Sequence, residues 1–237
     1  MMKYSLLILF LLYGLFFLSR ANGATNHMII AQRAYDIFSR NNSFKAFANI
    51  LKRNMGTVEC GSSFPDWGYL CKSDAASEAL HWEPFLYQYA NYIAKKYKPG
   101  TKEYEENLAF LYGIVAHDYA DMVWHWGPDN RGFLQAISHF SSSYQDDFSK
   151  SHDAETGAEF YLSFRDAKEM SFSNWKFPAK DISEVYKQIN FSVSPIKLQA
   201  CTLVFFLETK AVKHVGKTLF ESKYQSASPF IEEEVDL

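Results

Sequence analysis

The chain of 237 residues has little cysteine, no excess of positive charge and few alternating β-branched patterns. With a net charge of −3, it has no basis for broad attraction to nucleic acid or to an anionic membrane, so no nucleic-acid partner is expected. The scarcity of period-two alternation argues against a sheet protein. The remaining composition, 48% hydrophobic and 22% charged, is typical of one sizeable globular domain.

Hydrophobic periodicity predicts an all-α fold, a single-domain helical bundle with no repeat or long linker. Capping residues support several boundaries: Thr25 or Asn26, Thr101, and Ser194 followed by Pro195. The residues between the second and third helices, 56–72, are predicted to form a loop. The expected helices cover residues 27–40, 44–54, 77–97 with an interruption near Pro84, 102–126, a short stretch from 132, 152–170, 179–189 and 194–224.

Residues 1–23 are predicted to be a signal peptide. Lys3 supplies a positive start, residues 4–18 are apolar, and Ala21-Asn22-Gly23 fits a cleavage site. The apolar run is shorter than the roughly 20 residues that a membrane span needs. We therefore expect a mature domain over residues 24–237, secreted to the extracellular space or into an endomembrane lumen. Sequons at Asn41 and Asn190 fit glycosylation there.

The three cysteines then allow one internal disulfide and leave one thiol. Cys60 and Cys71 flank a short segment rich in Gly, Ser and Pro, which favours their pairing. Cys201 lies in an apolar run and is expected to be a buried free thiol.

The strongest functional pattern lies near the middle of the chain. His117, Asp121 and His125 recur at every fourth residue, so they share one face of the predicted helix. Neighbouring members lie about 6 Å apart along the axis and the outer pair about 12 Å apart. Zinc–ligand bonds are only about 2 Å long, so one ion cannot bind both histidines. If all three residues bind metal, at least two ions are present and Asp121 is placed to bridge them.

Further ligand candidates of the same chemical types lie elsewhere in the chain. His27 opens the first helix, Asp66 lies in a Phe-Pro-Asp-Trp-Gly turn, and His81 precedes a tryptophan. His152 and Glu155 share a predicted helix face, with Glu159 one turn further as an alternative to Glu155. Mixed histidine and carboxylate ligands suit zinc and hydrolytic chemistry. The other two histidines, His139 and His214, are assigned structural roles.

Together these motifs resemble the zinc-dependent phospholipase C family. The resemblance is carried by the Asn-His-Met-Ile-Ile segment that begins at Asn26, Phe-Pro-Asp at 64–66, His-Trp-x-Pro-Phe at 81–85 and His-x3-Asp-x3-His at 117–125. These motifs and Ser-Pro-Phe at 228–230 look most like the branch of glycosylphosphatidylinositol-specific phospholipases D, in their N-terminal catalytic domain.

This resemblance implies three groups of zinc ligands in a multi-zinc cleft. They are Asp66, His81, His117 and Asp121 for one ion, His125, His152 and Glu155 for a second, and Asp121 with His27 for a third. Asp66 is also the implied general base. The chain departs from bacterial members at Thr156, where they carry the carboxylate that Glu155 supplies here one residue earlier. It also has only three residues between the predicted cleavage site and His27.

The implied function is a secreted zinc phosphodiesterase, acting as a monomer on phospholipids or glycolipid anchors with transient contact to a membrane surface. Two or three zinc ions are the implied cofactors. Cleavage of the C type on phosphatidylcholine-like lipids, a non-catalytic lipid- or glycan-binding module and a single-strand nuclease are the alternatives. The aromatic residues beside the ligands are expected to be divided between the cleft and the core; they are Trp67, Tyr69, Trp82, Phe85, Trp124 and Trp126.

Overall fold

The computed structural model describes residues 23–126, 132 and 175–219, with side chains for all of these except 126 and 211–219. Every element in these stretches is helical, which confirms the all-α prediction. The elements are α2 (Ala24–Ser39), η1 (Asn42–Phe44), α3 (Lys45–Arg53), α4 (Met55–Ser63), η2 (Phe64–Cys71), α5 (Asp74–Glu78), α6 (Phe85–Lys96), α7 (Lys102–Asp121), η3 (Met122–Trp126), α10 (Ala179–Gln188) and α11 (Pro195–Leu219).

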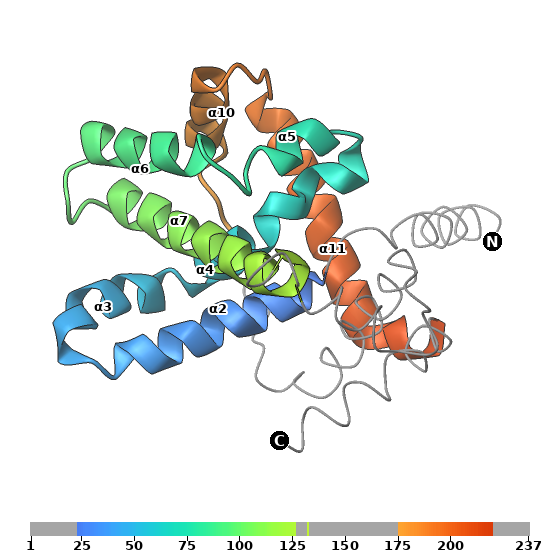
Figure 1. Ribbon diagram of the computed structural model, residues 1–237, viewed down its shortest axis with the longest axis horizontal. Coiled ribbons are helices and arrows are strands. Elements are labelled where there is room, and N and C mark those ends of the chain that lie inside the picture. The colour runs from blue at the N-terminus through green and yellow to red at the C-terminus, as the bar shows by residue number, and fades with distance from the viewer. Residues whose placement is uncertain (1–22, 127–131, 133–174, 220–237) are drawn as a thin grey trace, which may run out of the picture.

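Helix α7 is the central element, and it packs against α2, α3, α4 and α6 (Figure 1). The Thr101 side chain accepts a hydrogen bond from the Tyr104 backbone N–H and caps its start, as predicted. Helix α4 approaches α7 closely at two glycines. A Cβ on Gly61 would lie 2.4 Å from the Phe110 carbonyl oxygen, and a Cβ on Gly113 would lie 2.5 Å from that of Val58. Only glycine permits this contact.

Two apolar clusters stabilise the helices on either side of α7. The smaller one includes Ala31, Leu51 and Val58 between α2, α3 and α4. The larger one is rich in aromatic residues and joins η2, α6, α7, α10 and α11. Within it, Trp67 Nε1 donates to Tyr186 Oη at 3.0 Å, so these fully buried aromatics also satisfy their polar atoms. The buried η2 segment thereby has a fixed position.

The segment predicted as a loop, 56–72, is instead helical. It forms α4 and η2, and residues 57–68 are buried. Its Gly and Ser residues have weak helix propensity, but packing against α7 outweighs that preference. The prediction was wrong because local composition does not reveal a close contact with a distant helix.

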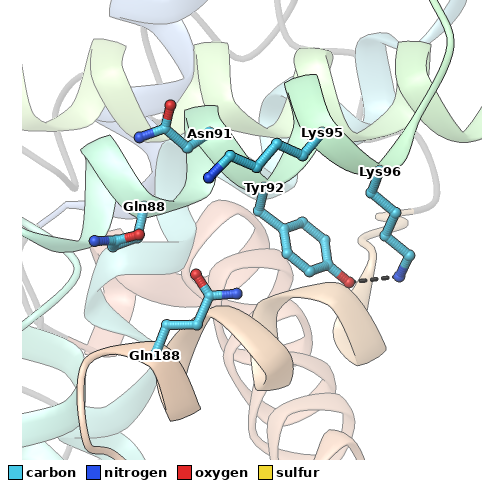
Figure 2. Close-up of a pocket in the computed structure, with 6 residues that line it drawn as sticks. All are labelled: Gln88, Asn91, Tyr92, Lys95, Lys96 and Gln188. Carbon is cyan, nitrogen blue, oxygen red and sulfur yellow. Dashed lines mark hydrogen bonds between the residues drawn. The ribbon is translucent and has the colours of Figure 1, made fainter.

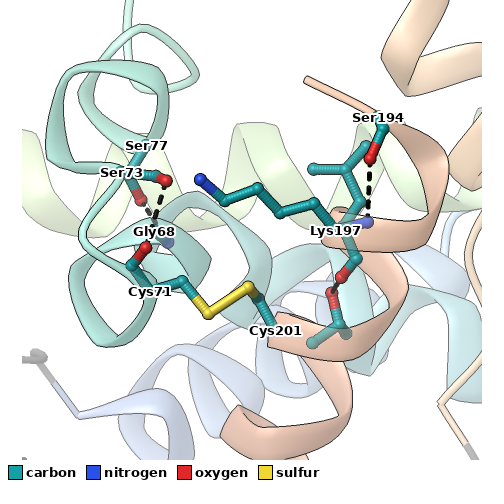
Figure 3. The surroundings of a disulfide bond; sticks show 9 residues. Gly68, Cys71, Ser73, Ser77, Ser194, Lys197 and Cys201 are labelled. Atoms are coloured by element: carbon teal, nitrogen blue, oxygen red, sulfur yellow. Dashed lines mark hydrogen bonds between the residues drawn. A yellow bond between two sulfur atoms is a disulfide. The ribbon is translucent and has the colours of Figure 1, made fainter.

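The predicted disulfide was also wrong. Cys71 pairs with Cys201, with Cα atoms 6.0 Å apart, and the bridge ties the end of η2 to α11 (Figure 3). Cys60 is the free cysteine and lies fully buried in the larger apolar cluster. Burial raises the pKa of its thiol well above the ordinary value, so it remains a neutral core residue.

Other boundaries shift by a few residues. Helix α2 begins at Ala24, and its N-cap residue is Gly23, which has no side chain to cap the helix. The predicted caps Thr25 and Asn26 lie inside the first turn instead. The interruption near Pro84 divides the predicted 77–97 helix into α5 and α6. Helix α11 starts at Pro195 as predicted, and the Lys197 N–H donates to Ser194 Oγ at 3.2 Å. The predicted helices from 132 and over 152–170 lie outside the described residues, apart from Gly132 itself.

A polar groove lies between α6 and α10, and none of the predicted metal ligands lines it (Figure 2). Beside it, the buried Asp181 carboxylate accepts hydrogen bonds from Tyr92, Lys96, Tyr97 and Asn107. Among the described helices, none combines the length and the apolar character that crossing a membrane requires.

Candidate metal centre

Four segments bring the predicted ligands together. Helix α2 carries His27 in its first turn, η2 carries Asp66, and the turn after α5 carries His81. The last turn and a half of α7 carries His117 and Asp121. All five side chains are buried, with Asp66 1% and His117 0% exposed.

Asp121 lies at the centre of four histidines. Its Oδ1 is 3.3 Å from His27 Nε2 and 3.9 Å from His125 Nε2. Its Oδ2 is 3.2 Å from His117 Nε2 and 3.5 Å from His81 Nε2. Each carboxylate oxygen therefore faces a different pair of histidines. A carboxylate that bridges two cations needs this division of its oxygens.

The backbone fixes the orientation of two of these rings. His117 Nδ1 lies 2.9 Å from the Ser62 carbonyl oxygen, and His81 Nδ1 lies 3.2 Å from the Ser77 carbonyl oxygen. A carbonyl oxygen only accepts, so each Nδ1 must donate. In the neutral rings, both Nε2 atoms then present lone pairs, and these atoms are 3.1 Å apart. Two lone pairs so close repel one another unless a proton or a metal cation is shared between them.

Several buried polar atoms of the cluster have no hydrogen-bond partner among the described residues. These atoms are both carboxylate oxygens of Asp66 and Nδ1 of His27. Asp66 Oδ1 is 3.6 Å from His81 Nε2, beyond hydrogen-bonding distance. Buried polar groups are otherwise almost always paired, because an unpaired one costs about 1–3 kcal/mol. Their geometry indicates an additional ligand.

The electrostatics of the cluster also reflect its burial. Burial lowers the pKa of His27 to about 4, and positive charge on His117 acts in the same direction. For His117, burial opposes protonation, but the Asp121 and Asp66 carboxylates outweigh it and raise the pKa to about 10. Burial would raise the pKa of Asp121, but His117 and His27 hold it well below the ordinary value. Without a metal, a proton on His117 balances part of the carboxylate charge.

The spacing of the donor atoms fits zinc. Nitrogen and oxygen ligands of a tetrahedral zinc ion are about 3.3 Å apart, because each bond is about 2.0–2.1 Å long. Two groups of three ligand atoms have all their members within 4.8 Å of one another. They are His27, His117 and Asp121, and Asp66, His81 and His117. Zinc-binding histidines commonly donate their other ring N–H to a carbonyl oxygen, as Nδ1 of His117 and of His81 does here.

His125 is placed differently from a straight helical stripe. The α-helix ends at Asp121 and continues as a π-helix over Met122–Trp126, which changes the rotation per residue. His125 still faces Asp121, but at the longest of the four distances. Its predicted partners His152 and Glu155, and the alternative Glu159, lie outside the described residues.

Two carboxylates near the centre, Asp118 and Glu78, were not predicted from the sequence. Asp118 is 7% exposed, and neither of its oxygens has a hydrogen-bond partner in the described part of the chain. Burial raises its pKa to about 7, although His117 and His81 pull it down. Glu78 joins two aromatics at the edge of the site, Tyr69 and Trp82. Neither residue follows the four-residue spacing that identified Asp121, so no sequence signal marked them.

The described aromatic residues beside the ligands are divided between the core and the edge of the site, and the side chain of Trp126 lies outside the description. Trp67 and Phe85 are fully buried in the core. Trp124, together with Gly23, His27, Ile30 and Asp121 among others, lines a small cavity of about 100 Å³. Tyr69 is half-buried, and Trp82 is exposed beside His81.

The comparison with known families agrees with this geometry. The sequence pattern described as "Zinc dependent phospholipase C" matches residues 26–210. The chain belongs to the zinc-dependent phospholipase C family. This stretch contains every ligand predicted above, from His27 to Glu155.

Relatives of the chain carry the name phosphatidylinositol-glycan-specific phospholipase D. The protein from Dictyostelium discoideum is 28% identical over 97% of this chain and 25% of its own length. The rat protein is 28% identical over 94% of this chain and 28% of its own length, and the human protein is 27% identical over 90% and 26%. The chain therefore spans about a quarter of these relatives. No solved structure matches it.

Proposed function

We propose that this protein is a secreted zinc-dependent phosphodiesterase that cleaves phospholipids, with glycosylphosphatidylinositol anchors as its substrate class and D-type cleavage. The observation that carries the proposal is Asp121, whose two oxygens face four histidine nitrogens at 3.2–3.9 Å, beside an Asp66 carboxylate that has no hydrogen-bond partner among the described residues. The names of the relatives in the comparison support the lipid class, although they describe proteins about four times as long.

Two or three zinc ions would be held by Asp66, His81, His117, Asp121 and His27, with His125 joined by His152 and Glu155. Zinc in such a site supplies Lewis acidity toward the phosphodiester oxygens and makes water acidic enough to react near neutral pH. The protein contributes the orientation. His117 and His81 donate hydrogen bonds from Nδ1 to the carbonyl oxygens of Ser62 and Ser77, which fixes the two rings, and burial excludes bulk water from the ligand atoms.

Asp66 has two oxygens and can serve two roles. Its Oδ1 points toward His81 and His117, at 3.6 and 4.0 Å, and so belongs with the ligand atoms. Its Oδ2 has no hydrogen-bond partner among the described residues and is available to accept a proton from the attacking water. In the hydrolysis, the water oxygen bonds to phosphorus, one P–O ester bond breaks, and the departing alkoxide takes up a proton.

Product analysis tests this proposal most directly. Purified protein is given labelled phosphatidylinositol-glycan and labelled phosphatidylcholine, before chelation, after chelation and after zinc is restored. D-type cleavage releases phosphatidic acid, whereas C-type cleavage releases diacylglycerol. We expect phosphatidic acid from the inositol-glycan lipid, loss of turnover on chelation and recovery with zinc.

The other possible results would each assign a different function to the chain. Diacylglycerol from phosphatidylcholine would assign the alternative C-type activity. Zinc-loaded protein that binds lipid without turnover would make the chain a binding module. Turnover that survives complete metal removal would refute zinc catalysis. Faster cleavage of single-stranded DNA or RNA than of either lipid would assign a nuclease.

The predicted leader over residues 1–23 supports action outside the cytosol. Gly23 lines the same small cavity as His27 and Asp121. The start of the mature domain would therefore lie beside the ligands. The protein acts as a monomer that meets the membrane transiently, which sedimentation with and without phospholipid vesicles would test.

A further inference from the structure

The sequon that begins at Asn190 forms the end of helix α10. The Phe191 N–H donates to the Tyr186 carbonyl oxygen at 2.9 Å, and the Asn190 N–H donates to that of Lys187 at 3.2 Å. These two bonds make a Schellman cap, in which Asn190 takes the left-handed position with a φ of 65°. Asparagine is enriched in that conformation. Phe191 packs against Tyr186, whereas Asn190 and Ser192 are exposed. The fold therefore presents both reactive residues of the sequon to solvent.

The polar groove of Figure 2 lies beside this sequon. Gln188, the last residue of α10, lines one side of the groove, which has a volume of about 350 Å³. Consecutive Cα atoms are 3.8 Å apart, so those of Gln188 and Asn190 are separated by at most about 7.6 Å. A sugar attached to Asn190 therefore starts at the edge of the groove. The residues that line the other side all belong to α6, namely Gln88, Asn91, Tyr92, Lys95 and Lys96.

The groove is rich in side-chain carboxamides that the fold does not use. Those of Gln88, Asn91 and Gln188 form no hydrogen bond with one another or with any other described residue. Gln188 reaches from α10 toward α6 (Figure 2). Each carboxamide offers two donors and one acceptor. Sugar hydroxyls also both donate and accept, so these carboxamides match them at every contact.

Tyr92 gives the groove a fixed aromatic wall. Its Oη donates to the buried Asp181 carboxylate at 2.7 Å and accepts a hydrogen bond from Lys96. The Lys96 ammonium also donates to Asp181 at 2.6 Å, so its charge is already paired. The Tyr92 ring therefore keeps one orientation and can offer an apolar face. The groove combines an apolar face with free donors and acceptors, which are the two kinds of surface that a sugar ring presents.

We propose that Asn190 carries an N-linked glycan and that the groove between α6 and α10 holds its first sugars. In the transfer, Asn190 Nδ2 bonds to the anomeric carbon of a sugar. The bond from that carbon to the diphosphate of a lipid-linked oligosaccharide breaks, and one amide proton goes to the departing diphosphate. The modification requires entry into a secretory lumen, which the predicted leader supports, and it does not depend on phospholipid hydrolysis.

The other sequon supplies a control within the same molecule. Asn41 is also exposed, but it lies in the turn between α2 and α3, well away from α10 (Figure 1). The full chain is expressed in a secretory host, and glycopeptide mass spectrometry gives the occupancy of both sites. The native protein is then treated with a glycan-releasing amidase. We expect release from Asn190 to be about tenfold slower than release from Asn41, the effect of one or two net hydrogen bonds. After denaturation the two rates should be equal.

Variants at the hydroxyl residue of each sequon test the effect on stability. Ser192→Ala removes the sequon and leaves the cap at Asn190 in place, whereas Ser192→Thr preserves the sequon. We expect Ser192→Ala to lose the glycan and to lower the unfolding temperature by about 2–4 °C, and Ser192→Thr to match the wild type. Ser43→Ala removes the sequon at Asn41 and should leave the unfolding temperature unchanged.

A groove variant separates the modification from the place of the glycan. Gln88→Ala combined with Gln188→Ala keeps the sequon, and release from Asn190 should then be about tenfold faster than in the wild type. Equal release rates in this variant and the wild type would overturn the groove as the place of the glycan. An unmodified Asn190 in the secreted protein, or retention of the chain in the cytosol, would overturn the whole proposal. None of these measurements uses a lipid, so failure of the proposed phosphodiesterase activity would leave their results unchanged.

Discussion

Two buried carboxylates of this fold, Asp181 and Asp66, have opposite surroundings. Asp181 accepts hydrogen bonds from Lys96 at 2.6 Å, Tyr92 at 2.7 Å and Tyr97 at 2.9 Å, in a network that borders the groove of Figure 2. Asp66 is more deeply buried, at 1% against 8% exposure, yet neither of its oxygens has a hydrogen-bond partner among the described residues. The first carboxylate is satisfied by the fold itself.

The hydrogen bonding of a buried carboxylate separates a structural from a functional charge in this domain. A buried charge that is fully hydrogen-bonded holds helices together, here α6, α7 and α10. A buried charge that meets only histidine nitrogens beyond hydrogen-bonding distance needs a further partner beyond the described residues, such as a metal cation. The two sites should therefore respond in opposite ways to the same substitution.

The largest effect is expected at Asp66. Asp66→Asn removes both the proton acceptor and one charged ligand, so hydrolysis of phospholipid should fall by about 10³-fold. Stability should change little, because no described side chain donates a hydrogen bond to this carboxylate. The rate of phospholipid hydrolysis and the unfolding temperature, measured on the same preparation, report the activity and the stability. A variant that keeps full activity, or whose unfolding temperature falls as far as that of Asp181→Asn, would contradict the comparison.

The disulfide carries the next largest effect. Cys71 ends η2, which carries Asp66, and its bridge to Cys201 closes a loop with a sequence separation of 130. Replacing both residues by serine should lower the free energy of unfolding by about 3–5 kcal/mol in urea titrations. Cys60→Ser is the control and should cost less, about 1–2 kcal/mol, since it only places a hydroxyl in the core. A larger loss of stability in Cys60→Ser than in the double variant would contradict the Cys71–Cys201 bridge and favour the Cys60–Cys71 pairing predicted from sequence.

At Asp181 the expected effect is on stability alone. Asp181→Asn weakens hydrogen bonds from Lys96 and the two tyrosines, and should lower the free energy of unfolding by about 2 kcal/mol at pH 7 without loss of zinc. Glu184→Gln, on the exposed face of the same helix, should change it by less than about 0.5 kcal/mol. Loss of zinc from Asp181→Asn would show that the two carboxylates are not independent.

The stabilisation that Asp181 provides should be lost at low pH. Burial would raise the pKa of Asp181, but the hydrogen bonds from Lys96, Tyr92 and Asn107 outweigh it and place the folded-state pKa below the ordinary value. The stabilisation is therefore complete above the unfolded-state pKa of about 3.9 and is lost as the pH falls through the lower folded-state pKa. The wild-type advantage over Asp181→Asn should be constant from pH 5 to 8 and shrink below about pH 4.

The sequence predicted the parts of this fold that depend on local chemistry. The helical class, the Thr101 cap and the start of α11 follow from periodicity and capping residues within a few positions. The same spacing rule placed His117 and Asp121 on one helix face, and the structure brings His27, Asp66 and His81 to them. Ligand-type residues are recognisable in sequence because few other roles need them together.

What could not be predicted depends on contacts between distant segments. The stretch that contains Gly61 is helical only because α4 meets α7 at Gly113, which local composition does not reveal. The Cys71–Cys201 bridge depends on how η2 meets α11, so proximity in sequence misled the pairing. Asp118 and Glu78 follow no ligand spacing, and only burial and hydrogen bonds distinguish them.

The smallest effect is expected at the start of the mature domain. Gly23 lines the same small cavity as His27 and Asp121, and α2 begins at Ala24. We therefore predict that the free amino group of a mature chain beginning at Ala24 is a further ligand of the ion shared by His27 and Asp121. A protein that begins at Ala24 should bind the ion shared by His27 and Asp121 more tightly, by less than about tenfold, than one with two added residues. This ion should also leave first during mild chelation. Equal zinc affinity of the two proteins would show that the terminus is not a ligand.

The central claim is that the histidine–carboxylate cluster is a zinc site organised by Asp121, whereas Asp181 is structural. The most direct test is the number of zinc ions per chain, measured side by side in the wild type and in Asp121→Ala, His27→Ala and Asp181→Asn. We predict two to three ions in the wild type and in Asp181→Asn, a loss of about one in His27→Ala, and a larger loss in Asp121→Ala. Fewer than one zinc ion in the wild type, or equal losses in Asp121→Ala and His27→Ala, would contradict the account.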